Sequence, residues 1–349
     1  MKQVILILII SLSGSDLYAD YLRVSRKASI KAAATSSSGT LASVEEDELL
    51  DLLDGGQQVN GYYHVRGNTF SGSGWIYRTF VRRYYGQMPQ RVTDQDLIEN
   101  PLRDPTHKLT DQERAYASRH LKLGMPQGLY HRVYEGYVTA QDARLKIPIW
   151  VQYELTSADL DGPATRRDNF RPDTSIPKIA RAETGDYAGS NYDQGHMAPA
   201  EDMNRSEKVM DESFLLSNMA PQTGIGFNRH IWAYLESAIR GWVRQRGSLT
   251  VITGAVFQAQ EKIVSYPVIG ENAVAVPTHF YKIVVDANDP DDIQVLAFLI
   301  PNEKVEGGTY AAYLTSVRKI ELLTGLDFLS ALPKSTQDRI EIVVAGSVW

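Results

Sequence analysis

Two stretches of this 349-residue sequence decide its fold, and the first is Tyr-Asp-Gln-Gly-His-Met-Ala-Pro-Ala at residues 192–200. It places an acidic residue, a glycine and a histidine within four positions, at Asp193, Gly195 and His196. Pro199 follows and stops any helix, because proline has no backbone N–H to donate and its ring collides with the preceding turn. The pattern predicts the end of a strand or a tight loop that presents His196.

The second stretch, Gly-Phe-Asn-Arg-His-Ile-Trp-Ala-Tyr-Leu-Glu at residues 226–236, predicts a helix that starts after a turn. Its glycine suits the turn, and Asn228 stands where a helix is commonly capped by a side-chain oxygen. Asn228, Glu236 and Arg240 are separated by multiples of four, so the helical repeat brings them onto one face. Apolar residues at a helical period predict the buried stripe of the helix: Ile231, Leu235, Ile239 and Trp242.

Together these stretches resemble the signatures of the DNA/RNA non-specific endonuclease family, a group of ββα-metal nucleases. The family signatures are an Asp-Arg-Gly-His segment and a later helix that reads Phe-Asn-Arg-x-x-Trp-x-x-Leu-Glu. The second signature is complete here, and the first is complete except that Gln194 stands in place of the arginine. The resemblance runs from about Ser118 to the C-terminus, and further matches follow in order along the chain: residues 124–126, 148–155, 167–173, 216–222 and 276–282.

For this part of the chain the resemblance implies an α+β fold, a ββα-metal finger nuclease domain with a central antiparallel sheet. The residues agree, since strand-like and helical segments mingle without a strict βαβ alternation. A helix is predicted at residues 310–324, and the β-branched segment 340–344 is expected to close the sheet. Apolar runs predict the main strands: residues 149–153, 249–254, 279–285 and 295–300.

The N-terminus predicts a secreted or periplasmic protein. Residues 1–19 combine Lys2, an apolar run and a small residue at Ala19, which is the pattern of a secretory signal peptide. The apolar run is too short to span a bilayer comfortably, so no stable membrane insertion is expected after cleavage. A retained membrane anchor is the alternative.

Residues 20–85 contain short strand-like pieces separated by turns and predict a small all-β barrel. Their order resembles a bacterial SH3-like domain, in which a Tyr-x-x-Val-Arg strand precedes a Gly-Trp-Ile strand. Such a domain implies a peptidoglycan or protein partner, and the alternative is a packing module that binds nothing. The polar, proline-containing segment 86–117 is predicted to be a linker, and the nuclease domain to span 118–349.

The composition is compatible with an enzyme that acts on nucleic acid. A hydrophobic content of 43% and a charged content of 22% are ordinary for a globular protein. The net charge of −6 opposes phosphate binding, so we expect a local basic strip from the arginines and the lysine of residues 166–181. The chain contains no cysteine, which excludes disulfides, cysteine nucleophiles and thiolate zinc sites.

Hydrolysis of a phosphodiester needs an activated water, a cation that neutralises developing charge, and help for the leaving oxygen. His196 is the candidate general base, because a neutral imidazole accepts a proton near ambient pH. The resemblance assigns this role to His196 and makes Asn228 the direct protein ligand of Mg²⁺, with Mn²⁺ able to replace it. It makes Glu236 the carboxylate that orients metal-bound water and Arg240 a stabiliser of the transition state; the alternative for both is a solvated helix face.

Four further residues complete the candidate site. Asp193 is expected to hold the loop or the histidine in place. Arg167, Gln194 and Asn218 are expected on the substrate side, Arg167 as a phosphate clamp and Asn218 as a support of the site. The neutral amide of Gln194 gives up the charge that the family arginine is thought to offer the phosphate, which predicts weaker substrate binding or a different substrate range.

With these residues in place, the resemblance implies a Mg²⁺-dependent, sugar-non-specific endonuclease that hydrolyses phosphodiester bonds in DNA and RNA and, by family analogy, leaves 5′-phosphate ends. An alternative from another class is a catalytically weak or inactive nuclease fold that binds nucleic acid, or the cell wall through the SH3-like module. Gln194 and the acidic net charge favour that alternative. Metal-dependent turnover separates the two, and a role as a toxin or as a nutrient scavenger stays open.

Overall fold

The computed structural model describes residues 20–45, 48–67, 70, 72–85, 109–126, 130–259, 262–263, 266–305 and 307–349. The expected signal peptide and residues 86–108 of the expected linker lie outside this range. The chain divides into two compact units, residues 1–87 and residues 88–349, and each is treated by itself. Across the described ranges, no helix is both long and apolar enough to cross a membrane.

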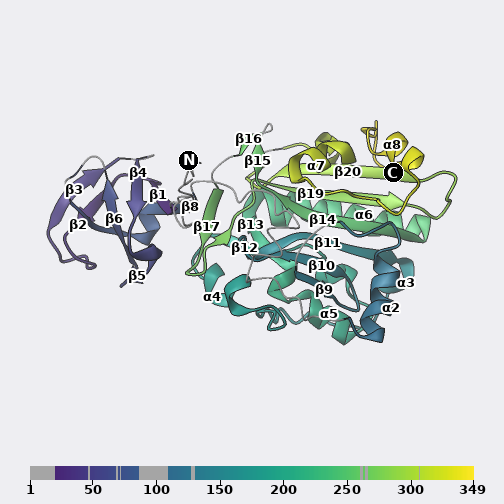
Figure 1. The fold of residues 1–349 in the computed structure, drawn as a ribbon, viewed down its shortest axis with the longest axis horizontal. Helices are drawn as coiled ribbons and strands as arrows, with labels where there is room; N and C mark the ends of the chain where they lie inside the picture. The colour runs from purple at the N-terminus through teal and green to yellow at the C-terminus, as the bar shows by residue number, and fades with distance from the viewer. Residues whose placement is uncertain are drawn as a thin grey trace, which may run out of the picture. The chain divides into compact units, whose positions relative to one another are not determined.

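The N-terminal unit is an antiparallel sheet of short strands (Figure 1). Its core consists of side chains that alternate along the strands, among them the fully buried Leu22, Ile30 and Val65. The all-β prediction is confirmed, but no pairing within the described part joins β3 to β8, so closure into a barrel stays a prediction. In spatial order the strands are β8 (Val81–Tyr85), β1 (Asp20–Val24), β4 (Leu49–Leu52), β6 (Tyr62–Gly67), β7 (Gly74–Tyr77), β2 (Ala28–Lys31) and β3 (Thr40–Val44), with β5 (Gln58–Val59) beside β6.

The larger unit is built on a seven-stranded antiparallel sheet, which confirms the α+β class (Figure 1). Each predicted main strand falls inside an observed one, because long apolar runs fit a sheet that is covered on both faces. In spatial order the strands are β21 (Leu314–Thr315), β20 (Gln294–Pro301), β19 (His279–Asp286), β14 (Ser248–Val256), β11 (Ile147–Thr156), β10 (Val138–Asp142) and β9 (Tyr130–Val133).

Helices and short strands surround this sheet. The main helices are α2 (Asp111–His120), α3 (Ser157–Leu160), α4 (Thr184–Tyr187), α5 (Glu207–Ser213), α6 (Ala233–Arg246), α7 (Val317–Thr324) and α8 (Lys334–Ile340). The short strands are β12 (Tyr192–His196), β13 (Met219–Thr223), β15 (Gln258–Ala259), β16 (Lys262–Ile263), β17 (Tyr266–Ile269) and β18 (Val274–Ala275).

Alternation along β19 defines the two faces of the sheet. Ile283 packs in a core that also contains Ile320 of α7. The neighbouring side chains Phe280 and Lys282 point to the opposite face, where both contact the ring of Trp232 at the start of α6. The helix that carries the second sequence signature therefore packs on one face of the sheet, and α7 covers the other.

Helix α2 begins with the capping box that the sequence contains, since Thr110 and Glu113 exchange side-chain and backbone hydrogen bonds. Leu109 and Ala117 pack against a buried cluster of the sheet that includes Trp150. The last part of the expected linker therefore buries apolar surface on the sheet of the larger unit.

Two predictions for the C-terminal part are wrong. The expected helix 310–324 is broken, because β21 pairs with β20 and the Ser316 side chain then caps α7 by accepting a hydrogen bond from the Lys319 amide. The segment 340–344 forms no strand: α8 ends at Ile340, and the edge position of the sheet is already filled by β21. Ile342 is accordingly 62% exposed.

Candidate active site

His196 is the last residue of β12, as the first sequence stretch predicts, and β12 pairs with β13 in an antiparallel ribbon. Asn218, just before β13, fixes the chain that follows the histidine. Its side-chain oxygen accepts from the Ala198 amide at 2.9 Å, and its side-chain nitrogen donates to the carbonyl oxygens of Ala198 and Ser213 at 2.8 Å each. The glycine at 195 is required, because a Cβ atom there would lie 2.1 Å from the buried side chain of Gln222.

The imidazole of His196 sits between aromatic rings. Phe170 and Phe214 meet it edge-on, with ring centroids 5.6 Å and 5.1 Å away. Burial, together with the nearby positive charge of Arg166, lowers the pKa of His196 to about 3. Its Nε2 atom is buried and has no hydrogen-bond partner in the described part of the chain. The ring is therefore neutral at physiological pH and able to accept a proton.

The helix of the second stretch begins with a sharp turn. Ile225 and Gly226 have non-helical backbone angles, and the φ of Gly226 is 89°, a value that favours glycine. A side chain at Gly226 would also collide with the backbone of Lys304. Asn228 lies beyond these two residues, inside the helix, so its expected role as the helix cap is wrong. The Asn228 side chain lines the pocket instead.

Asp193 determines how the Asn228 amide is oriented. Asn228 Nδ2 donates to Asp193 Oδ2 at 2.9 Å, and the Arg229 guanidinium donates to both oxygens of the same carboxylate at 2.8 Å and 2.5 Å. Because the amide nitrogen is engaged, the carbonyl oxygen of Asn228 is the atom available to a ligand. Asp193 therefore orients the Asn228 amide, and none of its side-chain hydrogen bonds within the described residues goes to His196.

Glu236 lies in a buried group of charges at the base of the pocket. Its Oε1 atom has no hydrogen-bond partner within the described residues and lies 3.8 Å from Nζ of Lys282, which is fully buried. Burial raises the pKa of Glu236, while the Lys282 ammonium opposes that rise. Arg240 points to Asp202, with Nη1 and Oδ1 3.0 Å apart, and Tyr153 donates to the other oxygen of that carboxylate.

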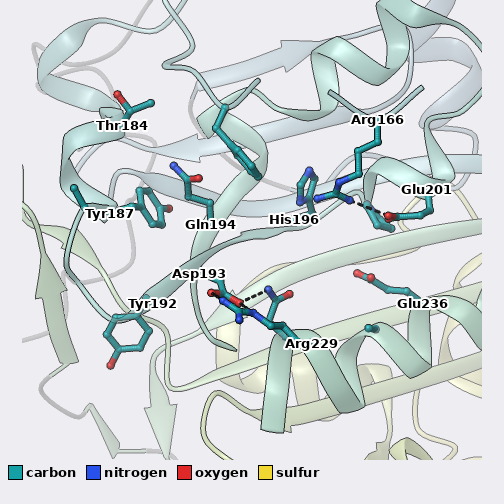
Figure 2. A pocket seen from close by; sticks show the side chains of 15 residues that line it. Arg166, Thr184, Tyr187, Tyr192, Asp193, Gln194, His196, Glu201, Arg229 and Glu236 are labelled. Carbon is teal, nitrogen blue, oxygen red and sulfur yellow. Dashed lines mark hydrogen bonds and ion pairs between the residues drawn. The ribbon is translucent and has the colours of Figure 1, made fainter. Parts of the chain in front are cut away.

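A cavity of about 620 Å³ brings much of the predicted site together (Figure 2). Figure 2 shows that Gln194 and His196 come from β12 and Glu236 from the facing helix, while Asp193 lies beside Arg229. Five of the residues singled out in the sequence line this cavity: Asp193, Gln194, His196, Asn228 and Glu236.

Three predicted residues do not line the cavity. Arg167 is paired with Glu207, Arg240 is paired with Asp202, and Asn218 is fully buried. The Asn218 amide is engaged by the backbone of Ala198 and Ser213, so it supports the loop after His196 and is not free to contact a substrate. The geometry likewise places Arg240 behind Glu236, where it neutralises the buried Asp202.

The sequence singled out neither Arg166 nor Arg229 as a site residue, yet both line the cavity. Arg166 donates to Asp168 at 2.7 Å and to Glu201 at 2.8 Å, and it lies over the ring of Phe214. It occupies the place expected for Arg167, and the neighbouring arginines 166 and 167 were the available signal. Arg229 is part of the second signature but was read only as a helix residue.

The pocket suits a hard divalent cation held by few protein atoms. Among the described residues no group of three or more His, Asp or Glu could hold a metal. The pocket instead offers the oriented carbonyl oxygen of Asn228 and the carboxylate of Glu236, whose Oε1 atom makes no hydrogen bond among the described residues and lies 3.8 Å from Nζ of Lys282. Hard cations prefer oxygen ligands, and Mg²⁺ commonly keeps several waters, so these residues fit such an ion.

Comparisons with known proteins agree with this geometry. The chain is 38% identical to a nuclease from Syncephalastrum racemosum over 67% of this chain and 78% of that protein. It is 34% identical to the mitochondrial endonuclease G of Homo sapiens over 65% of this chain and 78% of that protein. A crystal structure of an EndoG/EndoGI complex aligns with a TM-score of 0.59 and 31% identity, covering 65% of this chain and 95% of the other.

The family comparison covers the site itself. The family described as DNA/RNA non-specific endonuclease matches residues 117–335, well over half of the chain. This range contains both sequence signatures and every residue that lines the pocket. Members of the family are non-specific endonucleases that hydrolyse phosphodiester bonds and depend on a divalent metal. On these grounds the chain belongs to the DNA/RNA non-specific endonuclease family.

Proposed function

We propose that this protein is a Mg²⁺-dependent, sugar-non-specific endonuclease that cuts both DNA and RNA and leaves 5′-phosphate ends. The observation that carries the proposal is the convergence of His196, Asn228 and Glu236 on one cavity, where Nε2 of His196 and Oε1 of Glu236 make no hydrogen bond within the described chain. Buried polar atoms without partners are costly, and at a functional site the substrate or its water can satisfy them.

In this proposal His196 is the general base. Its lowered pKa keeps the imidazole neutral, so a ring nitrogen can take a proton from the attacking water. Phe170 and Phe214 hold the ring and exclude competing water. Asn218 keeps the following loop in register, so that the base stays at the cavity.

Asn228 would hold the metal through its carbonyl oxygen, and Mn²⁺ could replace Mg²⁺ there. When bound, the cation supplies charge that stabilises the developing phosphorane and the leaving oxygen. Glu236 orients water within the cavity, and Arg166 binds the phosphate. Arg240 contributes indirectly, because it neutralises Asp202 next to Glu236.

The test is cleavage of supercoiled plasmid and of single-stranded RNA by the purified chain, with Mg²⁺, Mn²⁺ or EDTA. We expect cation-dependent cutting of both substrates and loss of cutting in Asn228→Ala and His196→Ala. Retention of near wild-type rates in His196→Ala would reject the assigned base. No cutting with any divalent cation would favour the nucleic-acid-binding alternative.

We also propose that residues 1–19 direct export and that the N-terminal unit is an SH3-like module for peptidoglycan or a protein partner. The support is the signal-like sequence and the all-β unit described above. N-terminal sequencing of the exported protein should give a mature chain that starts near Asp20. Co-sedimentation of that chain with insoluble peptidoglycan tests whether peptidoglycan is the partner. If the chain stays in the supernatant, peptidoglycan is rejected and a protein is the partner to test next.

A further inference from the structure

The pocket contains an uncharged part that the reaction does not use. Figure 2 shows Thr184, Tyr187, Gln194 and Tyr192 on one side of His196, with the Asp193–Arg229 ion pair between Gln194 and Tyr192, whereas Arg166, Glu201 and Glu236 lie on its other side. We call this part the neutral lobe, and it consists of Thr184, Tyr187, Ala188, Tyr192 and Gln194.

Gln194 places a hydrogen-bonding amide in the neutral lobe. It is half-buried on β12, two residues before His196, and its amide has no hydrogen-bond partner in the described part of the chain. One donor group and one acceptor group are therefore available to a ligand at this position.

Tyr187 gives the lobe a second unused polar group. The residue is only 7% exposed, and its hydroxyl is buried without a partner among the described residues. In Figure 2 the hydroxyl end of the ring is turned toward Gln194 and the interior of the pocket. Burial raises the pKa of Tyr187 well above its ordinary range, so the group stays a neutral donor. Like Nε2 of His196 and Oε1 of Glu236, it is a pocket atom that a ligand could satisfy.

The wall that carries Tyr187 is fixed in place. Its neighbour Asp186 accepts hydrogen bonds from the backbone amide and the side chain of Asn272, each at 3.0 Å. Asp186 also accepts from the Glu183 amide at the start of α4. The hydroxyl is therefore presented by a braced element, which lowers the cost of ordering the site when a ligand binds.

The chemistry of the lobe matches a nucleobase better than a second phosphate. A phosphate would need a cation, but the lobe residues carry none, and Arg229, which also lines the cavity, is already paired with Asp193. A base offers a flat, uncharged ring with donors and acceptors on its edge, which a glutamine amide recognises well. The half-buried ring of Tyr192 adds an aromatic surface of the kind on which bases stack.

Building on the proposed nuclease function, we propose that the neutral lobe binds the base of a nucleotide that flanks the scissile phosphate. A base inside a duplex is stacked and paired, so it must leave the helix to enter the lobe. The enzyme therefore acts preferentially on unpaired nucleotides. The cavity volume of about 620 Å³ lies within the usual range for sites that enclose a small ligand.

The test measures binding without turnover. Fluorescence anisotropy in EDTA compares a labelled single-stranded hexanucleotide with an abasic strand of the same length and charge. For the wild-type chain we expect the abasic strand to bind more weakly by about 5- to 100-fold, the usual range for loss of base stacking. Tyr187→Phe and Gln194→Ala should each reduce that ratio by about threefold or more.

Two further variants sharpen the comparison. Gln194→Arg should strengthen binding of both strands and shrink the ratio, because the added charge contacts phosphate. Tyr313→Phe removes a hydroxyl outside the pocket and should leave the ratio unchanged. Equal affinity of the intact and abasic strands for the wild-type chain overturns the proposal, as does an unchanged ratio in both Tyr187→Phe and Gln194→Ala.

Failure of this inference is distinguishable from failure of the proposed function. Equal binding of the two strands alongside Mg²⁺-dependent cleavage rejects the neutral lobe and leaves the nuclease assignment. A base-dependent affinity in a chain that cuts nothing rejects the hydrolase assignment and leaves the lobe. In an active enzyme, kcat/KM should also be higher for a single strand than for a duplex of the same sequence.

Discussion

Replacement of Asp193 by alanine should weaken metal binding without unfolding the protein. Asp193 receives one hydrogen bond from Asn228 at 2.9 Å and two from Arg229 at 2.8 Å and 2.5 Å. The Arg229 side chain is 64% exposed, so solvent screens its ion pair and losing that pair costs the fold little. Loss of the hydrogen bond from Asn228 to the ionised carboxylate adds about 1.5–3 kcal/mol.

The larger effect concerns the orientation of Asn228. Without the Asp193 carboxylate, the Asn228 amide can rotate so that either its oxygen or its nitrogen faces the cavity. Loss of a residue that orients a metal ligand commonly lowers metal affinity about 10- to 100-fold. The half-saturating Mg²⁺ concentration for plasmid nicking should therefore rise by that factor in Asp193→Ala, with little change in the maximal rate.

Two variants serve as controls for this measurement. Asp193→Asn retains an acceptor for the Asn228 amide, so the half-saturating concentration should rise less. Arg229→Met leaves the bond between Asp193 and Asn228 intact and should have the smallest effect. If Asp193→Ala keeps the wild-type half-saturating concentration but loses maximal rate, the reasoning is refuted, because Asp193 then acts on the chemical step and not through Asn228.

The pH dependence of Mg²⁺ affinity follows from the same contacts. Burial alone would raise the pKa of Asp193, but the hydrogen bonds from Arg229 and Asn228 outweigh it and hold the pKa below its ordinary value. Asp193 therefore stays ionised at any pH at which an ordinary aspartate is ionised, and at somewhat lower pH as well. Titration of Asp193 should therefore not change the Mg²⁺ affinity between pH 8 and pH 5. Arg229→Met should raise the pH at which affinity begins to fall.

Three other substitutions test the rest of the site. Arg166→Met should raise KM about 10- to 100-fold through loss of a charged phosphate contact, and it should move the acidic limb of the kcat/KM profile to higher pH, because the Arg166 charge helps to lower the pKa of His196. Asn218→Ala should lower the free energy of unfolding by about 3 kcal/mol or more, since three buried backbone groups lose their partner. Urea titration measures this loss. The control is Asn204→Ala, which loses one hydrogen bond of 3.3 Å and should lower the free energy of unfolding by about 1 kcal/mol. Gly195→Ala should cost about 1–3 kcal/mol and reduce kcat, because the new methyl group collides with Gln222 next to the base; wild-type stability and turnover would contradict the close packing.

The sequence by itself determined the two elements that carry the chemistry. The spacing of Asp193, Gly195 and His196 before a proline predicted a strand end, and a helical apolar period predicted the helix with Asn228 and Glu236. Both features are local, since period and turn residues act over a few positions, and the structure has them where expected. Resemblance to the family then supplied the roles of these residues, which no spacing could assign.

Only the tertiary structure decided which polar side chains reach the cavity. Arg166 and Arg167 are adjacent in sequence, yet the first lines the pocket and the second pairs with Glu207 on the outside. Arg240 shares the helix face of Glu236, but the buried Asp202 draws it away from the cavity. In each case the partner comes from a distant segment, and the direction of a long polar side chain depends on which charge that segment presents.

The same reason explains the C-terminal errors and the neutral lobe. The β-branched segment 340–344 has strand propensity, but pairing also needs a free sheet edge. Strand β21 occupies the edge position next to β20. Tyr187 and Gln194 lie on different elements, α4 and β12, so their approach to one cavity depends on packing across the fold. The local sequence pattern determines whether a segment is a helix or a strand. Contacts between distant elements determine the direction in which its polar side chains point.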